Sequence, residues 1–549
     1  MLRPLRACIM NPSMECHCLP FHKIPHTTQL FSTFAENFDK VAAYYGQPPT
    51  VAGVLAAARK IQLDEKVRQG VVEVLREQNK AFGSGPDTIR NLERLANGAA
   101  GIVTGQQVGL FTGPAYSLYK AVSAVRYAEE ITKAGVDSVP IFWLATEDHD
   151  FAEINHVAWN SKKGLAEFGM AERESEAGHR VGKIKLGAPV TALVAKALGS
   201  LEGSFGKEIA NALRESYTRD DTYGSAFGKL MARLLAGRGI IFLDPLDSRF
   251  HRFAASIYRR ALDEAAPLRD SLLARSKELD KAGYHAQVKV TGESTLLFYD
   301  VDGRRQPLRS RNGKCTAGHA SFTLAELQAA IEKTPEAFTP NVLLRPIVQD
   351  TLLPTAAYIG GPAEIAYMAQ AQVVYDKLLG RMPAILPRAS FTIVEAPVAR
   401  LLGKFGLEIG DVFRGHQHLR GRMEQKALPR ALASRFDAGE KTLRKLLKSY
   451  QAPLMRLDRT LVGALDSAER KMLHQFAKLK GKAGRAENLR IGVLDRYERI
   501  LLDSLYPHRA LQERSVSPLP WLVEYGSAFV DDLARLATVE AQQHHIVYL

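Results

Sequence analysis

One stretch of the sequence, residues 99–150, constrains the fold more than any other. An apolar run at 100–103 leads into a polar, glycine-rich turn at 104–113, and good helix formers follow as far as Ala134. A second apolar run at 139–145 then ends in charged residues. Two short apolar runs joined through a helix are typical of a βαβ unit, in which the two strands are parallel. Since parallel sheets occur almost only in α/β proteins, this stretch predicts an α/β fold.

Polar residues follow both predicted strands, at the edge where open parallel sheets bind ligands. After the first strand, Pro114 suits the first position of a helix, because its fixed φ is helical and its missing N–H costs nothing there. The free N–H groups of such a helix start can bind an anion, and the glycines of residues 105–113 allow close backbone approach. The turn has neither the lysine of a Walker loop nor the dinucleotide fingerprint, so a purely structural turn is the alternative.

Four titratable residues, Glu147, Asp148, His149 and Asp150, follow the second strand. Carboxylates beside an imidazole can act as a general base, bind a substrate ammonium or hydroxyl group, or hold a metal. The alternative is a helix start with favourable acidic residues. The sequence has no nucleophile elbow of the Gly-x-Ser-x-Gly type, so covalent catalysis is unsupported.

The same order of features occurs again later in the chain. A predicted strand at 356–359 is followed by Gly360-Gly361-Pro362 and then by a helix to about Leu379. This repeat predicts a second helix start at the same edge of the sheet. The preceding run at 341–350, which ends in polar side chains, is interpreted as a further core strand.

The remaining patterns predict two insertions, an arm and a tail. Residues 284–310 alternate as strands do and turn at Asp302-Gly303, which indicates a β-hairpin. Apolar residues recur every three or four positions from Leu443 to Leu479, which is typical of a coiled coil, with a tip at 481–484 and a return at 489–505. The regions are therefore an unpatterned extension at 1–15, a core at 16–390 with insertions near 151–237 and 284–340, a helical coiled-coil arm at 391–507, and a tail at 508–549 that docks on the core.

The net charge of +14 is concentrated in the arm. Residues 421–485 hold sixteen Lys and Arg and six Asp and Glu, a net of +10. Such an arm could bind the phosphate backbone of a nucleic acid, but a charge run is more often the solvated face of a long helix. The arm also lacks the interleaved aromatic residues on which bases stack, so nucleic-acid binding is the weaker alternative.

Membrane, secreted and metal-binding classes find no support in the sequence. No stretch approaches the roughly 18–20 apolar residues of a membrane span. The first ten residues lack the apolar segment of a signal peptide, and Met14 is an alternative start. Four cysteines make no disulfide framework in a chain of this length, and Cys16-His17-Cys18 fits no zinc spacing, so we expect no metal. These features predict a cytoplasmic protein.

Several blocks of residues resemble one known family. The longest runs from Thr104-Gly105-Gln106-Gln107 through Pro114 and Tyr116 to Lys120, and another joins Phe142-Trp143 to the Glu147–Asp150 cluster. The blocks lie at residues 24–31, 104–121, 142–156, 345–355, 358–367, 511–514 and 545–549. They resemble the cysteine-adding enzymes of bacillithiol biosynthesis, the BshC family, and span nearly the whole chain.

The resemblance implies a Rossmann-like parallel-sheet core with two connecting insertions and a C-terminal antiparallel α-helical coiled coil, in a homodimer. It implies a ligase that adds L-cysteine to glucosaminyl-malate in the last step of bacillithiol synthesis; a related amide-forming or nucleotidyl-transferase-like enzyme acting on another amine is an alternative. The family core is similar to class I aminoacyl-tRNA synthetases. Their His-x-Gly-His and Lys-Met-Ser-Lys-Ser motifs are missing from this sequence, so ATP or another nucleotide is not established as a cofactor.

The predicted site combines the acidic cluster with the two glycine-rich turns. Glu147, Asp148, His149 and Asp150 are the candidate catalytic residues, which would orient or deprotonate the substrate amine. The candidates for substrate or anion binding are Thr104, Gly105, Gln106, Gln107, Gly109, Gly113, Tyr116, Lys120, Gln349, Asp350, Gly360, Gly361 and Glu364.

Overall fold

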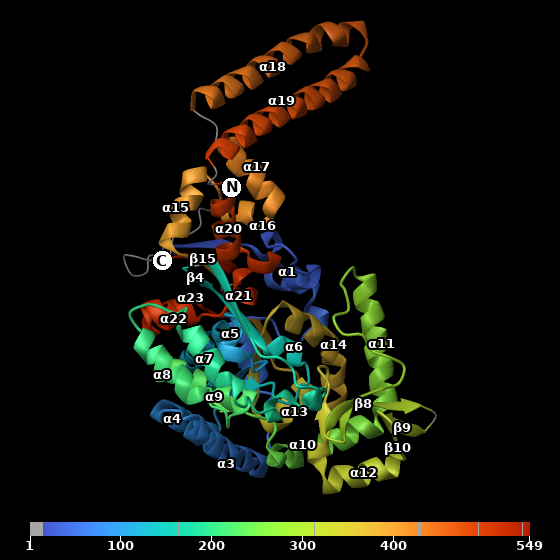
Figure 1. The fold of residues 1–549 in the computed structure, drawn as a ribbon. Coiled ribbons are helices and arrows are strands. Elements are labelled where there is room, and N and C mark those ends of the chain that lie inside the picture. Colours follow the sequence, from blue (N-terminus) through green and yellow to red (C-terminus); the bar gives the residue numbers. More distant parts are fainter. Residues whose placement is uncertain (1–14, 163, 312, 427–429, 492–493, 541) are drawn as a thin grey trace. The chain divides into compact units, whose positions relative to one another are not determined.

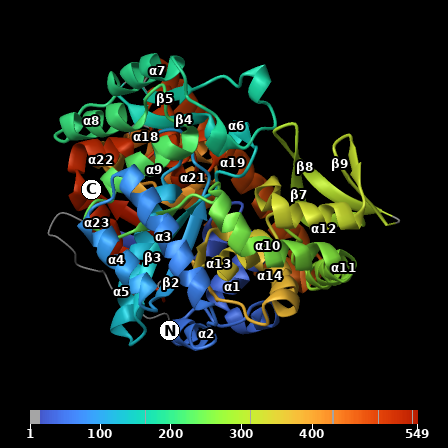
Figure 2. The ribbon, with the colours of Figure 1, turned by 90° about the horizontal axis from the view of Figure 1, so that it is seen from below.

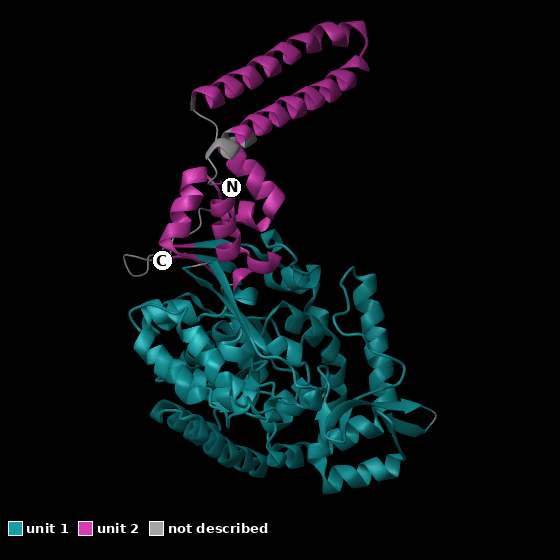
Figure 3. Ribbon diagram, viewed as in Figure 1, with its two compact units in different colours: residues 1–5, 17–391, 513–546 teal, residues 6–16, 392–512, 547–549 magenta. Residues whose placement is uncertain are grey.

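The computed structural model describes residues 15–162, 164–311, 313–426, 430–491, 494–540 and 542–549 (Figure 1). Except for Glu15, the predicted extension at residues 1–15 lies outside the described residues. The chain forms two compact units (Figure 3). Unit 1 holds residues 17–391 and 513–546, and unit 2 holds residues 392–512 with short pieces near both termini. Among the described residues, none of the helices combines the length and the apolar character needed to span a bilayer.

Unit 1 is built on a five-stranded parallel sheet, which confirms the predicted Rossmann-like α/β core. The strand order is β13-β12-β2-β3-β6. The strands are β2 (Ala100–Gln106), β3 (Ser138–Leu144), β6 (Ile241–Leu243), β12 (Thr355–Gly360) and β13 (Ala384–Pro387). From β2 the chain builds the sheet outward through β3 and β6, and later returns on the other side with β12 and β13. The boundary between β2 and β12 is therefore a topological switch point, where open α/β sheets bind ligands.

Burial on both faces explains why the core strands are continuous apolar runs in the sequence. Val103 of β2 pairs with Ile141 of β3 on one side and with Tyr358 of β12 on the other. All seven residues of β3 are buried. A strand that is covered on both faces has no solvent side, so polar residues do not alternate with apolar ones.

Helices connect these strands and cover the sheet. α5 (Tyr116–Lys133) leads from β2 to β3, and α14 (Pro362–Leu378) leads from β12 to β13, each after a glycine-rich turn as predicted. Nearer the N-terminus lie α1 (Gln29–Glu36), α2 (Val51–Ala58), α3 (Glu65–Phe82) and α4 (Pro86–Ala96). Residues 51–82 thus form two helices, α2 and α3. Asp64 begins the second one, since its Oδ1 accepts hydrogen bonds from the backbone N–H of Lys66 and Val67.

Two groups of elements are inserted between the core strands (Figure 2). After β3 come α6 (Phe151–Ile154), the hairpin β4 (His156–Ser161) and β5 (Gly164–Gly169), α7 (Pro189–Leu198), α8 (Gly206–Ser216) and α9 (Tyr223–Leu234). After β6 come α10 (Ser248–Asp263), α11 (Ala265–Lys281), β7 (Ser294–Val301), β8 (Arg304–Arg311), β9 (Lys314–Ala317), β10 (Ala320–Phe322), α12 (Leu324–Lys333) and β11 (Phe338–Pro340). The second insertion forms its own sheet in the order β10-β9-β8-β7-β11.

The hairpin predicted in the second insertion is confirmed. β7 and β8 are antiparallel, with Val301 opposite Arg304 across the two turn residues. Asp302 and Gly303 have φ values of 51° and 78°. Left-handed φ at both central positions fits the right-handed twist of the flanking strands, and Asp-Gly adopts it readily.

The strand predicted at residues 341–350 is wrong, because α13 (Arg345–Leu352) occupies this run. Asn341 starts the helix: its Oδ1 accepts from the backbone N–H of Leu343 and Leu344, and its carbonyl accepts from that of Arg345. Pro346 stands in the first turn, where its lack of an N–H is harmless. A short apolar run does not by itself distinguish a buried strand from a buried helix.

Unit 2 consists mainly of helices, as the arm prediction expects, and a coiled-coil hairpin forms its longest part. Its helices are α15 (Ala396–Phe405), α16 (Ile409–Phe413), α17 (His416–Lys426), α18 (Arg430–Leu457), α19 (Leu461–Ile491) and α20 (Leu494–Leu505). The predicted tip at 481–484 is wrong, since these residues lie inside α19. The chain turns instead at Asp458–Thr460, where Asp458 Oδ1 accepts from the N–H and the hydroxyl of Thr460, each at 2.8 Å. Both legs carry apolar residues at helical spacing, so the sequence pattern continues across the turn.

The last part of the chain returns to unit 1. It contains α21 (Gln512–Ser515), α22 (Leu519–Tyr525), α23 (Ser527–Leu536) and β15 (His544–Tyr548). β15 is the middle strand of a three-stranded sheet between β1 (Glu15–Leu19) and β14 (Ser390–Val394). Within unit 1, the backbone N–H of Ala115 donates to the carbonyl of Val516 at 2.7 Å, so the tail contacts the start of α5.

Candidate active site

A hollow of about 560 Å³ opens in unit 1 at the switch point between β2 and β12. Its wall comes from the end of β2, the first turns of α5 and α14, the segment after β3, the second insertion and the tail. Nine of the predicted site residues line it: Gly105, Gln106, Gln107, Tyr116, Lys120, Asp148, Gln349, Gly361 and Glu364. Eight others do not: Thr104, Gly109, Gly113, Glu147, His149, Asp150, Asp350 and Gly360. The structure therefore brings nine of the candidates together at one hollow and places the other eight outside its wall.

The second half of the glycine-rich turn packs inside the protein. A Cβ on Gly109 would lie 2.8 Å from the Cα of Gly113, so these two glycines allow a close backbone crossing. The N–H of Phe111 donates to the hydroxyl of Tyr217 at 2.8 Å, and that of Ala115 donates to Val516. Both N–H groups have partners within the protein, so residues 109–113 serve packing.

The start of α14 is occupied by the chain's own carboxylate. Glu364 Oε2 accepts from the backbone N–H of Gly361 at 2.7 Å and from Lys120 Nζ at 2.6 Å. Lys120 also donates to the carbonyl of Gly105 and to Gln106 Oε1, both at 2.7 Å. Burial lowers the pKa of Lys120, while the charge of Glu364 acts in the opposite direction. Lys120 thus links the two glycine-rich turns, and Glu364 fills the anion position that the second turn was predicted to offer.

Asp148 is held by two arginines on the floor of the hollow. Arg345 makes a bidentate ion pair with it, Gln107 Nε2 donates to Oδ2 at 2.6 Å, and Arg305 lies 3.5 Å from Oδ1. Burial alone would raise the pKa of Asp148, but Arg345 and Arg305 outweigh it and hold the pKa below its ordinary value. Asp148 is therefore a fixed carboxylate whose lone pairs are engaged, which suits positioning better than proton transfer.

His149 and Asp150 lie at the surface beside the hollow. The Nδ1 of His149 is 3.2 Å from a terminal nitrogen of Arg305. A guanidinium only donates, so Nδ1 is the acceptor and the neutral imidazole carries its proton on Nε2. Partial burial and the charge of Arg305 lower the pKa of His149. In this arrangement its basic nitrogen is already in use.

Glu147 lies behind the hollow, in the interior. It is 2% exposed, and its Oε1 is 3.5 Å from Nε2 of His251. Nδ1 of His251 lies 3.1 Å from the hydroxyl of Tyr258. Burial raises the pKa of Glu147 and lowers that of His251 to about 4. Of the four residues at 147–150, Glu147 is thus the most deeply buried.

The structure adds five charged residues that pattern analysis did not select: Glu153, Arg305, Arg345, Arg388 and Arg514. Glu153 stands on α6, and its carboxylate has no hydrogen-bond partner among the described residues. Burial raises the pKa of Glu153 above its ordinary value, and the negative charges of Asp150 and Asp148 act in the same direction. Glu153 belongs to a block that carries the family resemblance, which was the one available indication. The arginines come from distant segments, so no local spacing could group them.

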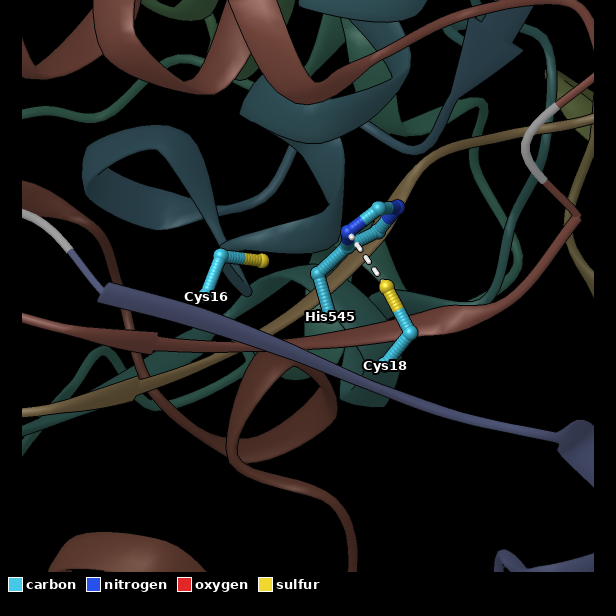
Figure 4. Close-up of side chains that lie close together, drawn as sticks. All are labelled: Cys16, Cys18 and His545. Carbon is cyan, nitrogen blue, oxygen red and sulfur yellow. Dashed lines mark hydrogen bonds between the residues drawn. The ribbon is translucent and has the colours of Figure 1, made fainter. Parts of the chain in front are cut away.

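The pair Cys18 and His545 joins two strands of unit 1. Cys18 Sγ on β1 lies 3.6 Å from Nδ1 of His545 on β15 (Figure 4). Cys16, also drawn there, belongs to unit 2. Zinc takes three or four protein ligands. One thiol and one imidazole of unit 1 are fewer than that number, and the expectation that Cys16-His17-Cys18 binds no metal stays a prediction.

Comparison with known proteins gives matches over nearly the whole chain. The model described as "Bacillithiol biosynthesis BshC, N-terminal Rossmann-like domain" matches residues 14–389, and that of the C-terminal coiled-coil domain matches residues 391–549. A Koribacter versatilis protein is 39% identical over 96% of this chain and 99% of its own length. A Solibacter usitatus protein is 37% identical over 97% of this chain and all of its own length. Both carry the name "Putative cysteine ligase BshC".

Acidification should destabilise unit 1 through His251. Its pKa is about 4 in the folded protein and about 6.5 in the unfolded chain, so below pH 6.5 the unfolded chain binds a proton that the folded protein does not. The free energy of unfolding should fall between about pH 6.5 and pH 4, by on the order of 2 kcal/mol at pH 5. The difference between the urea midpoints at pH 7.5 and pH 5 should be smaller in His251→Gln than in the native protein; part of it should remain, because burial also lowers the pKa of His544 to about 4. His319→Gln, at an exposed histidine, should leave the pH dependence of the urea midpoint unchanged. If the midpoint shifts equally between pH 7.5 and pH 5 in the native protein and in both variants, His251 is not responsible for the loss of stability.

Proposed function

Because the chain belongs to the BshC family of bacillithiol biosynthesis, we propose that it is a carbon–nitrogen ligase acting on L-cysteine. The reaction joins the cysteine carboxyl group to the amine of glucosaminyl-malate, as the last step of bacillithiol synthesis in the cytoplasm. The observation that carries this proposal is the coincidence of two findings. Relatives that carry the name "Putative cysteine ligase BshC" align over nearly the whole chain, and five of the seven blocks that carry the family resemblance contribute residues to one hollow.

Amide formation requires an unprotonated amine, and Glu153 is suited to accept its proton. The carboxylate lines the hollow, has no fixed partner, and has a raised pKa, which makes it a better base than an ordinary glutamate. Asp148, Arg305 and Arg345 would form a fixed part of the surface to which the substrate binds. His149 and Asp150, at the rim, would tune the local charge.

Gln106, Gln107 and Gln349 carry neutral amides at the hollow. Each already makes a hydrogen bond within the protein, with Lys120, Asp148 and Asp350 respectively, and the remaining amide donors and acceptors can bind hydroxyl groups of the amino sugar. Activation of the cysteine carboxyl group needs a donor, and a nucleotide such as ATP would supply it. The comparisons favour this enzyme over a nucleic-acid-binding protein, since family models match both the core and the arm.

The proposal is tested with purified protein, L-cysteine, glucosaminyl-malate and ATP, with mass spectrometry of the thiol product. We expect a product whose mass equals that of the two substrates less one water. Deletion of the gene in its host should remove the final thiol and accumulate the cysteine-free precursor. Unchanged thiol without precursor would overturn the assignment, and product formation only with another amine would redirect it within the same reaction class.

Glu153→Gln should lower kcat by about 10²- to 10⁴-fold with little change in KM, since general-base contributions are of this size. In the native enzyme kcat should fall at low pH, because the carboxylate must be ionised to accept a proton. His149→Gln is the matched control at the rim and should keep kcat within about threefold. An effect of Glu153→Gln confined to KM would show that this residue binds the ammonium group and transfers no proton.

We also propose that the arm mediates a homodimer. Large apolar side chains are exposed on both legs of the hairpin, including Leu446 at 51% and Leu479 at 55%. Leu443 and Phe476 line a shallow hollow beside them. Exposed apolar surface of this kind is typical of an interaction site.

Light scattering should therefore give a dimer mass for the native protein and a monomer mass for Leu446→Glu with Leu479→Glu, because a buried charge opposes association. Gln451→Glu adds the same charge at an exposed position of α18 and should remain dimeric. A double variant that is still dimeric would place the interface outside these two positions.

A further inference from the structure

Arg388, directly after β13, lines the hollow and forms an ion pair with Glu513 of the C-terminal tail. It is 6% exposed. Its two terminal nitrogens donate to the two carboxylate oxygens of Glu513 on α21, at 2.9 and 2.6 Å. One of them also donates to the carbonyl of Ala389 at 2.9 Å. All of these residues belong to unit 1.

Two of the five N–H donors of Arg388 remain without a partner among the described residues. They are the Nε–H and one N–H of the terminal nitrogen Nη2, which lie along one edge of the planar guanidinium. This edge has the spacing that binds two oxygens of a carboxylate or phosphate. A Cβ on Gly361 would lie 3.5 Å from the Nε, so the glycine leaves this edge uncovered.

Buried groups behind Glu513 fix the direction of Arg388. The hydroxyl of Ser390 lies 2.9 and 3.0 Å from the Glu513 oxygens, and the N–H of Phe391 donates to Oε2 at 3.0 Å. His544 Nδ1 is 2.7 Å from the same hydroxyl. Glu513 is 1% exposed, and Arg388 holds its pKa below the ordinary value although burial acts against this. The carboxylate is therefore an immobile anchor.

Arg514 adds a second positive charge to the same hollow, near the ring of Tyr116 that Arg388 also contacts. Their guanidinium carbons lie 5.9 and 5.4 Å from the ring centre of Tyr116. No carboxylate lies within ion-pair distance of Arg514 among the described residues. The charge of Arg388 is balanced by Glu513, so Arg514 supplies the unbalanced positive charge at this end of the hollow.

We infer that the free edge of Arg388, together with Arg514, is a binding site for an oxyanion group of the ligand, and that Glu513 is its positioning residue. A carboxylate of the acceptor substrate and a phosphate of an activating nucleotide share this chemistry. The inference rests on the proposed function only in taking this hollow as the ligand site. It places the anion at these two arginines and not at the start of α14, where the Gly361 N–H already donates to Glu364.

Gly361→Ala tests the edge of Arg388 directly. The backbone at Gly361 has φ −82° and ψ 179°, so alanine is accepted without strain; its methyl group would lie 3.5 Å from the Nε of Arg388, where an anion would approach, and 3.5 Å from Oε2 of Glu364. Calorimetric titration with malate and with inorganic phosphate should show at least a tenfold loss of affinity for one of the two anions. Gly85→Ala is a matched control: Gly85 also precedes a proline, has φ −82° and ψ −179°, and has nothing near its Cβ position.

Arg514→Gln should lower the affinity for the same anion. Arg388→Lys should also lower it, even if the variant folds less well, since lysine has no planar edge. A loss of affinity for malate would identify the bound group as a substrate carboxylate, and a loss of affinity for phosphate alone would identify it as a nucleotide phosphate. Unchanged binding of both anions in Gly361→Ala and Arg514→Gln would overturn the inference. These titrations involve no turnover, so a failed ligase assay with intact, edge-dependent anion binding would reject the proposed function and leave the site standing.

Glu513→Gln tests the positioning role. The amide keeps the shape and one acceptor but loses the charge that fixes Arg388. For the anionic substrate we expect KM to rise about tenfold while kcat stays within threefold, and Glu513→Asp to recover part of the loss. Equal losses of kcat and of folded protein, with KM unchanged, would show that Glu513 is only structural.

Discussion

A buried ammonium group holds together the edge of the sheet at which the hollow opens. Lys120 is 2% exposed, and a charge in such a place is unfavourable unless it is paired and hydrogen-bonded. Its three N–H bonds meet acceptors from the β2 turn and from the first turn of α14. The two strands that flank the switch point are thereby tied to each other at their carboxyl ends. Without Lys120, Glu364 and the carbonyl of Gly105 would lose their common partner.

This arrangement divides the ionised groups of the hollow into two sets. Asp148, Glu364 and Glu513 each have arginine or lysine partners at short distance, so their charges are balanced and their positions fixed. Glu153 and Arg514 have no ion partner among the described residues. The balanced set forms the scaffold, and the other set is available to a ligand. Which carboxylate can react is therefore decided by its neighbours and not by its place in an acidic cluster.

The sequence predicted the parts of the fold that depend on local pattern. The β2–α5–β3 unit, the β12–α14 repeat and the Asp302-Gly303 hairpin are all encoded in short segments, and all are present. The errors have local causes as well. Asn341 starts a helix in a run whose apolar residues suit either structure, and Asp458 turns a chain whose apolar spacing does not change.

The site was harder to predict because its charges are paired across long sequence distances. Asp148 follows β3 and looks like a free acid in the sequence, but its partner Arg345 lies 197 positions away. Likewise, Gly361 is followed three residues later by the glutamate that caps its own helix, which makes the turn look open to an anion when it is closed. The identity of the residues at the edge of the sheet could be predicted, whereas their partners required the three-dimensional structure.

The pairing of Arg388 with Glu513 also sets an order of events during synthesis. The two residues are 125 positions apart, and the whole helical arm lies between them in the chain. Since a chain leaves the ribosome from its N-terminus, the sheet and both glycine-rich turns are complete long before the anchor of Arg388 exists. The charge of Arg388 is therefore unbalanced in the nascent chain until residue 513 has been synthesised. A chain cut before Glu513 would leave this buried guanidinium without its carboxylate partner, however complete the sheet is.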